Sequence, residues 1–256
     1  METLILREGG VPFVAPSVRE EALDAKDTAL RFVEELEAGE FDMVICMTGI
    51  GLTLLRDTCA ALMPVERLAA ALRKTTIMSR GPKPVGVLRS LNVPIDIMIP
   101  EPNTWREIVA VVAARPERRL AVQEYGRLNA PMHSALAELG AQVTPVALYR
   151  WELPEDQEPL REAVGRIAGG GCDVVLFTSS VQLDHLLMVA ASMSLETEVR
   201  GALKKRLVVG SIGPVMNDAL AAEGIAPDIV PRRPKMWALV KAAAEQAAAV
   251  MAVKAA

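Results

Sequence analysis

The stretch V-T-P-V-A-L-Y-R-W, residues 143–151, decides how this 256-residue chain is organised, because similar motifs run along the sequence on either side of it. The motif S-R-G-P at 79–82 has a counterpart in S-I-G-P at 211–214, and the two lie 132 positions apart. The same separation joins Trp105 with Trp237. It also joins Leu54 with Leu186, Leu88 with Leu220, Asp96 with Asp228, and Pro102 with Pro234. The sequence therefore predicts a duplicated unit with a hinge between its halves.

Strands alternate with helices in both halves, which predicts two α/β domains with parallel sheets that helices cover on both faces. Residues 17–151 are expected to form an inserted domain that includes the linker strands. Residues 1–16 together with 152–256 are expected to form a discontinuous first domain, whose N-terminal part contains a short strand over 11–14. The strand predicted at 120–123 has no counterpart in the first half, so the repeat predicts that a strand is missing before Met1.

Composition limits the classes of partner. The formal net charge of −4 disfavours nucleic acid as the main ligand. The Ala-rich stretch 242–256 is interrupted by Glu245, Gln246 and Lys254, so no membrane span is expected. The few, scattered cysteines are typical of free thiols in a reducing compartment. A cytoplasmic monomer is expected. The cysteines are Cys46, Cys59 and Cys172.

Four loops that connect a predicted strand to a helix are candidates for ligand binding, because ligands of parallel α/β sheets bind beyond the carboxyl ends of the strands. Glycines and small residues there let backbone N–H groups face an anion. Taken alone, each loop is better explained by helix capping and tight turns, and only the occurrence of two sets on two domains makes a ligand cleft an equal alternative. The candidates are Thr48 and Gly49, then Arg80, Gly81 and Lys83, then Thr178, Ser179 and Ser180, and finally Gly213 and Pro214.

Other kinds of site are disfavoured. His133 and His185 have no carboxylate or cysteine at a metal-ligand spacing, so no metal site is expected. The G-x-S-x-G, Walker and G-x-G-x-x-G patterns do not occur, which disfavours hydrolases, NTPases and dinucleotide-binding enzymes. Trp105 and Trp237 each lie early in a predicted helix, where packing is the expected role.

The motifs V-A-L-Y-R at 146–150, D-V-V-L-F-T-S-S-V at 173–181 and the G-P motif with A-L and P-D-I over 213–229 resemble those of uroporphyrinogen-III synthases. The resemblance covers almost the whole chain. It implies two α/β domains joined by a two-stranded linker, with the active site in a cleft between them. It also implies an enzyme without a cofactor that cyclises the linear tetrapyrrole hydroxymethylbilane to uroporphyrinogen III, with loss of water and inversion of ring D.

The resemblance also implies roles for individual residues. Tyr149 matches the linker tyrosine that is proposed to assist departure of the hydroxyl, although an aromatic that fills the hinge would look the same. Arg80, Lys83 and Arg127, with Gly126 beside Arg127, are expected to bind substrate carboxylates together with the loops named above. Met216 stands where the family often has Thr and is expected at the substrate site without a hydroxyl to offer.

Two other functions stay open. A non-catalytic relative could bind a tetrapyrrole or another polyanion in the same place, and Met216 and the missing strand favour that interpretation slightly. A periplasmic solute-binding protein has a similar two-domain plan, but the charged residues Glu2, Arg7 and Glu8 at the start of the chain disfavour a signal peptide.

Overall fold

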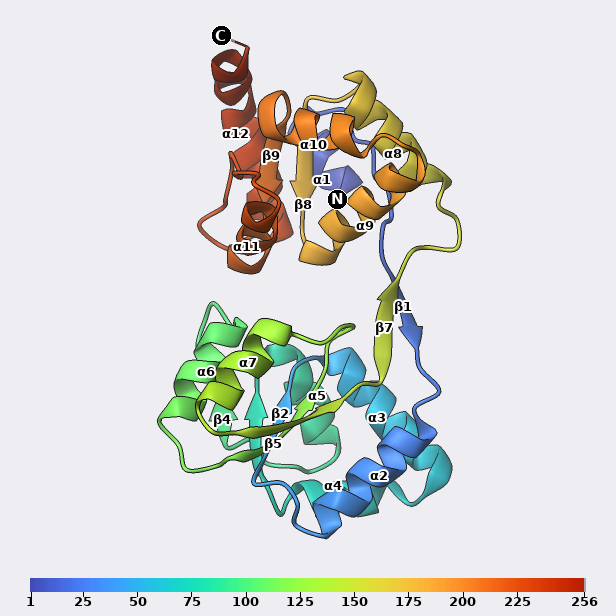
Figure 1. The fold of residues 1–256 in the computed structure, drawn as a ribbon, viewed down its shortest axis with the longest axis vertical. Coiled ribbons are helices and arrows are strands. Elements are labelled where there is room, and N and C mark those ends of the chain that lie inside the picture. Colours follow the sequence, from blue (N-terminus) through green and yellow to red (C-terminus); the bar gives the residue numbers. More distant parts are fainter. Residues whose placement is uncertain (256) are drawn as a thin grey trace. The chain divides into compact units, whose positions relative to one another are not determined.

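The computed structural model describes residues 1–255, which fall into two compact domains that are each described by themselves. The first domain comprises Met1–Arg19 and Glu152–Ala256, and the second comprises Glu20–Trp151. Figure 1 shows helices alternating with strands in both domains. The α/β class with parallel sheets, which the alternation predicted, is confirmed.

The second domain is built on a sheet of five parallel strands in the order β4-β3-β2-β5-β6. The strand β2 is central, because Met43 pairs with Thr76 on one side and with Leu120 on the other. Every residue of β2 is buried, as expected for a strand covered on both faces. The strands are β2 (Met43–Cys46), β3 (Thr76–Ser79), β4 (Ile97–Met98), β5 (Arg119–Gln123) and β6 (Gln142–Val146).

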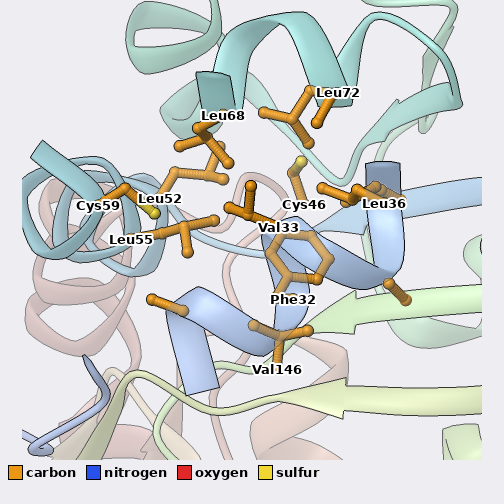
Figure 2. Close-up of a cluster of buried hydrophobic side chains, with 14 of the residues drawn as sticks. Phe32, Val33, Leu36, Cys46, Leu52, Leu55, Cys59, Leu68, Leu72 and Val146 are labelled. Carbon is orange, nitrogen blue, oxygen red and sulfur yellow. The ribbon is translucent and has the colours of Figure 1, made fainter. Parts of the chain in front are cut away.

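The side chains of β2 alternate between two hydrophobic cores, one on each face of this sheet. Val44 and Cys46 belong to one core, and Met43 and Ile45 belong to the other. Figure 2 shows the first core, where apolar side chains of α2, α3 and α4 surround Cys46. The helices are α2 (Lys26–Glu37), α3 (Gly49–Leu62), α4 (Val65–Leu72) and α5 (Pro82–Ser90) on the first core, and α6 (Trp105–Ala113) and α7 (Ala130–Glu138) on the second.

The first domain has a smaller sheet, in which β8 (Val174–Phe177) pairs in parallel with β9 (Val208–Ser211). Beside β9, a single parallel bridge joins Gly210 to Ile229. Helices surround this sheet: α1 (Glu2–Arg7), α8 (Glu158–Gly169), α9 (Ser180–Ser192), α10 (Glu196–Lys205), α11 (Pro214–Ala222) and α12 (Met236–Lys254).

The strand predicted at 11–14 does not form, and that prediction was wrong. Val11 is 98% exposed and Val14 is also exposed, so these apolar residues have no sheet to cover. Phe13 contacts a cation instead, with the guanidinium of Arg166 4.1 Å from the centre of its ring. An apolar run becomes a strand only where a neighbouring strand supplies hydrogen-bond partners.

Matching contacts occur in the two domains at positions that the predicted repeat relates. The Asp96 carboxylate accepts from the Ile77 backbone N–H at 2.7 Å, and Asp228 accepts from the Val209 N–H at the same distance. Asp96 and Asp228 are 132 positions apart, and so are Ile77 and Val209. Likewise, the hydroxyls of Ser79 and Ser211 donate to the carbonyls of Gly81 and Gly213, at 2.8 and 3.3 Å. The two halves therefore share local architecture as well as sequence.

Two short strands, β1 (Arg19–Ala22) and β7 (Tyr149–Glu152), pair with each other where the chain passes between the domains. The stretch over 143–151 forms two strands, because β6 ends at Val146 and β7 begins at Tyr149. Between them, the Leu148 carbonyl accepts from the Leu23 N–H at 3.1 Å. After Val146 the chain therefore leaves its sheet partner β5 and pairs with the segment around β1.

The C-terminal helix α12 is long and apolar enough, by length and composition alone, to cross a membrane, with a mean hydropathy of 1.3. In the structure it packs on β8 and β9 of the first domain and buries Leu239, Val240 and Ala243. At its end, Lys254 forms an ion pair of 2.6 Å with Asp228 and donates to the Leu207 carbonyl. These contacts account for α12 as the last layer of an α/β domain.

We expect Asp42→Asn to lower the stability of the second domain at pH 7 by about 1 kcal/mol. The Asp42 carboxylate accepts from the Arg119 side chain at 2.5 Å and from the Arg119 backbone N–H at 2.9 Å, which lowers its pKa to about 2. A lowered pKa stabilises the fold above the ordinary value of 3.8, and this stabilisation is lost as the pH falls towards 2. Urea unfolding should therefore show a difference at pH 7 that shrinks below pH 3.8.

The matched control is Asp24→Asn, which changes an exposed aspartate of the same domain. It should leave stability unchanged at both pH values. An equal loss in the two variants would mean that net charge, and not the Arg119 contact, is responsible.

Candidate functional site

The best-defined group of polar residues in the second domain lies at the carboxyl edge of its sheet. The strands β2, β3 and β5 are parallel neighbours, so the loops that follow them begin side by side. These loops carry Thr48, Arg80 and Tyr125. This edge is where parallel α/β sheets bind ligands. The fold therefore brings Thr48, Arg80 and Tyr125 to the same edge of this domain's sheet.

Tyr149 is held at the start of α3. Its side chain is 3% exposed, and its hydroxyl lies 3.3 Å from the hydroxyl of Thr48. Thr48 is the N-cap of α3, where its hydroxyl accepts from the Gly51 N–H at 3.1 Å. The Thr48 N–H donates to the side-chain carbonyl of Gln123, at the end of β5, at 2.9 Å. The tyrosine hydroxyl is thus positioned by residues of β7, α3 and β5.

Burial raises the pKa of Tyr149 above its ordinary value of 10, and the hydrogen bond from Thr48 opposes that shift. The phenol therefore stays protonated at neutral pH. In this state it can donate a hydrogen bond to an oxygen atom, and it is a weak source of a fully transferred proton.

An aromatic cluster lies beside this tyrosine. The guanidinium of Arg80 lies 5.0 Å from the centre of the Tyr125 ring, within range for a cation–π interaction. Tyr125 meets Trp151 edge to face, with ring centres 5.5 Å apart. Burial lowers the pKa of Arg80 from its ordinary value, while the nearby Tyr125 and Tyr149 oppose the shift, and an arginine remains charged at neutral pH. The domain thus holds a half-buried positive charge next to its tyrosines.

Gly126 makes this cluster possible. Its φ is +79°, and a Cβ at this position would overlap the indole of Trp151. The Trp151 N–H also donates to the Gly126 carbonyl at 3.2 Å. The observed reason for glycine at 126 is therefore close packing against Trp151, and the role in substrate binding stays a prediction. The neighbouring Arg127 is exposed.

The other candidates of this domain surround the same edge. A Cβ on Gly49 would lie 2.7 Å from the Lys83 carbonyl, so the starts of α3 and α5 are in close contact. Gly81 is the N-cap of α5 and lies against the side chain of Asn103. Lys83 is exposed on the first turn of α5. The structure thus brings Gly49, Gly81 and Lys83 together near the Thr48 loop.

In the first domain, Thr178, Ser179 and Ser180 lie between β8 and α9. The backbone N–H groups of Thr178 and Ser179 donate to the side-chain carbonyl of Gln182, at 2.7 and 3.1 Å. Ser179 and Gln182 form a capping box, so both N–H groups already have acceptors within the domain. The capping explanation that the sequence left open accounts for these contacts.

Gly213 and Pro214 begin α11 at the end of β9, as the repeat with Gly81 and Pro82 predicted. Met216 lies one turn later, is 1% exposed, and belongs to the hydrophobic core of this domain. Its side chain packs in the core, which is the ordinary role of a methionine in such a position.

Sequence reasoning missed a buried pair at the same edge of the second domain. Glu124 follows β5 directly and is 3% exposed, and one of its oxygens lies 2.6 Å from Nε2 of His133 on α7. The other oxygen has no hydrogen-bond partner among residues 1–255. Burial raises the pKa of Glu124, and His133 opposes the shift. The sequence feature that could have indicated this pair is that His133 lies in the first turn of the helix that follows the Glu124 loop.

We expect Glu124→Gln to stabilise the second domain by about 1 kcal/mol at pH 8, because the variant no longer buries a carboxylate with an unpaired oxygen. A raised pKa means that the wild-type protein gains stability below the ordinary value of 4.5 and loses it as the pH rises through the pKa of the folded state. Urea unfolding at pH 8 and pH 4 should show a benefit of the substitution at pH 8 only. Glu138→Gln, on the exposed face of α7, should have no effect at either pH.

The remaining reactive side chains offer no second centre in the described part of the chain. Burial raises the pKa of Cys46 to about 12 and that of Cys59 to about 11, so neither thiol ionises at neutral pH. Among residues 1–255, no group of three or more His, Cys, Asp or Glu side chains comes together as a metal site would require.

Comparisons with known proteins agree with this architecture. The solved structure of a mutant uroporphyrinogen III synthase of the extremely thermophilic bacterium Thermus thermophilus superposes with a TM-score of 0.71 at 23% identity, over 97% of this chain and 94% of that one. The wild-type enzyme gives a TM-score of 0.56 at 23% identity, over 98% and 94%. At these identities, the likeness establishes the fold alone.

Among curated proteins, the uncharacterized protein YjjA of Bacillus subtilis (strain 168) is 26% identical over 244 residues, which are 94% of this chain and 88% of that protein. The family model described as uroporphyrinogen-III synthase HemD matches residues 1–241. The resemblance drawn from the motifs is thereby confirmed, and the chain belongs to the uroporphyrinogen-III synthase family.

Proposed function

We propose that this protein is a uroporphyrinogen-III synthase, a lyase that cyclises hydroxymethylbilane to uroporphyrinogen III with loss of water and inversion of ring D. The observation that carries the proposal is the position of Tyr149, the tyrosine of the V-A-L-Y-R motif. Its protonated hydroxyl lies 3.3 Å from that of Thr48, at the edge of the sheet where ligands of such folds bind. Family membership supports the same activity.

The reaction requires little from the protein chemically. The bond between the terminal methylene carbon and the hydroxyl oxygen breaks, the hydroxyl gains a proton, and water leaves. The adjacent pyrrole stabilises the resulting azafulvene cation. The substituted carbon of ring D then attacks the cation and gives a spiro intermediate. The older bond from that carbon to the methylene of ring C breaks, this methylene bonds to the free α-carbon of ring D, and a proton is lost. Closure without the enzyme gives the type I isomer. Catalysis is therefore mainly a matter of positioning, and the reaction as proposed uses no metal or redox cofactor.

In this proposal Tyr149 donates a hydrogen bond to the departing hydroxyl. Its raised pKa suits hydrogen-bond donation better than full proton transfer. Thr48 can accept or donate in turn, because a threonine hydroxyl does both. Water can complete the protonation. Tyr149 is thus assigned as the catalytic residue, and Thr48 as the residue that positions it.

The substrate carries an acetate and a propionate on every pyrrole ring, so binding requires several partners for carboxylates. Lys83 and Arg127 are exposed cations near the edge of the sheet, and Arg80 is a half-buried cation beside Tyr125. The helices α3 and α5 begin here, and backbone N–H groups at the start of a helix favour anions. These groups are assigned to the acetate and propionate arms, and the ring under Arg80 is suited to a flat pyrrole.

One alternative keeps support from a specific observation. The Tyr149 hydroxyl is already paired with Thr48, and the N–H groups of Thr178 and Ser179 are already satisfied by Gln182. These contacts favour a relative that binds a tetrapyrrole or another polyanion without converting it. Such a protein would keep the fold and the cations but would not direct ring closure.

The two functions are separated by product analysis. The protein is incubated with hydroxymethylbilane, the products are oxidised, and the porphyrin isomers are resolved by chromatography against a sample without protein. A synthase gives mainly the type III isomer. Type I alone, at the rate of the sample without protein, would overturn the proposal. Binding of uroporphyrin together with that result would establish the non-catalytic alternative.

A further inference from the structure

A loop in the first domain carries three cations that the family motifs did not draw attention to. Arg232, Arg233 and Lys235 lie between the Gly210–Ile229 bridge and α12, and all three are exposed. None of them forms a side-chain hydrogen bond or an ion pair with any residue in 1–255. In a chain with a net charge of −4, these unpaired cations form a local positive region that attracts an anionic partner.

The fold places this loop at the carboxyl edge of the first domain's sheet. Ile229 bridges in parallel to Gly210 near the end of β9, so the residues that follow it continue beyond that edge. The loop also contacts the start of α11, because a Cβ on Gly213 would lie 3.5 Å from Cβ of Pro234. The cations of the loop are therefore attached to a segment that packs against the Gly213 turn.

The second domain has an equivalent G-P turn at Gly81, but its cations lie in the turn itself and not in the loop that packs against it. There, Gly81 lies against Asn103 as Gly213 lies against Pro234. The separation of 132 positions pairs Arg80 and Lys83, the cations beside Gly81, with the uncharged Ile212 and Val215. Conversely, it pairs Arg232, Arg233 and Lys235 with Pro100, Glu101 and Asn103.

Each domain thus has cations next to its equivalent G-P turn, but the two domains supply them from different loops. We infer that Arg232, Arg233 and Lys235 form a carboxylate-binding loop for the first domain, and that its ligand is the set of acetate and propionate arms of a tetrapyrrole. The inference rests on the proposed function and adds residues that it does not assign. Guanidinium groups match carboxylates with two parallel hydrogen bonds, and a lysine adds a point charge.

The residues that follow the loop fit the same ligand. Met236 is 41% exposed and Trp237 is 52% exposed, at the start of α12. An exposed indole beside cations offers an aromatic surface for a pyrrole ring whose acidic arms reach the cations. The same combination could suit the anionic surface of a membrane, so the test includes that partner.

The experiment compares two triple variants with the wild-type protein, using uroporphyrin as the probe because it retains every acetate and propionate arm. The loop variant is Arg232→Gln, Arg233→Gln and Lys235→Gln. The control variant is Arg161→Gln, Lys204→Gln and Lys205→Gln, which removes the same charge from exposed positions of the same domain. Porphyrin fluorescence titrations at two salt concentrations give the affinities, and circular dichroism checks that both variants are folded.

We expect the loop variant to bind uroporphyrin about 10- to 100-fold more weakly, with a smaller dependence on salt, and the control variant to bind within about threefold of wild type. Replacement of the two arginines by lysine should restore part of the affinity. Equal losses in the two triple variants would overturn the inference, because net charge alone would then explain them.

Two further outcomes are decisive. If wild type binds uroporphyrin and the loop variant binds it equally well, the loop has no role and the proposed function is untouched. If wild type does not bind it, the inference is overturned, and the proposed function is decided separately by the isomer analysis with hydroxymethylbilane. Vesicles of anionic phospholipid are tested in parallel. Loss of vesicle binding in the loop variant, with uroporphyrin binding retained, would overturn the inference in favour of a membrane-binding loop.

Discussion

Tyr149→Phe is expected to lower the rate of hydroxymethylbilane cyclisation by about 10²-fold, with little change in substrate affinity and with the type III isomer still favoured. General acid–base assistance contributes about 10²–10⁴-fold, and the low end applies because the azafulvene cation forms readily and water can replace the phenol as donor. The ring that remains still packs in the same buried position. Steady-state rates and isomer ratios measure the effect.

The comparison variant is Tyr125→Phe, in which the lost hydroxyl accepts a hydrogen bond from Asn129 and does not contact Thr48. The ring beneath Arg80 is retained. A rate loss much smaller than that of Tyr149→Phe is expected. If Tyr149→Phe keeps full turnover, Tyr149 is a packing residue. If it produces mainly the type I isomer, its role is to position ring D and not to assist departure of the hydroxyl.

Gly126→Ala is expected to destabilise the second domain by about 2–4 kcal/mol. Two costs add: the φ of +79° disfavours any residue with a Cβ, by roughly 1 kcal/mol, and the new Cβ overlaps the Trp151 ring, with an overpacking cost of roughly 1–3 kcal/mol. Displacement of Trp151 would also disturb Tyr125 and the Arg80 cation stacked on it. Urea unfolding of the purified variant measures the loss.

Gly140→Ala supplies the matched control. Gly140 has nearly the same φ, +78°, but a Cβ there would meet no atom within 4 Å. It should cost only the backbone term of about 1 kcal/mol. The difference between the two variants is then the energy of packing Gly126 against Trp151. Equal losses would mean that Trp151 moves aside freely, and combining Gly126→Ala with Trp151→Ala should remove most of the difference.

The sequence predicted the architecture well where local pattern and repetition decide it. The strand at Met43–Cys46 is apolar throughout and flanked by helical segments, so its pattern indicates the centre of a parallel sheet, and it is one. The repeat predicted equivalent turns at Gly81 and Gly213, and both begin helices with proline in the first turn. These features depend on neighbours in the sequence or on duplication.

Prediction failed where a distant partner decides the outcome. Residues 11–14 form an apolar run like that of a short strand, but without a neighbouring strand they remain irregular. The burial of the Met216 side chain in the core was not apparent from its motif, and its assignment to the substrate site stays a prediction. Glu124 and His133 are not at a metal-ligand spacing, and only the packing of α7 onto the end of β5 brings them within 2.6 Å.

The sequence by itself indicated the family and the α/β class with parallel sheets, because motifs and periodicity are properties of the chain alone. The tertiary structure decided which groups meet: Tyr149 with Thr48 across 101 positions, Arg80 with Tyr125, and Gly126 with Trp151. It also decided that Pro234, in the loop that carries the cations of the first domain, packs against Gly213. Thr48, Arg80 and Tyr125 become neighbours because the parallel strands before them end at one edge of a sheet, and β7 adds Tyr149 and Trp151 from outside that sheet.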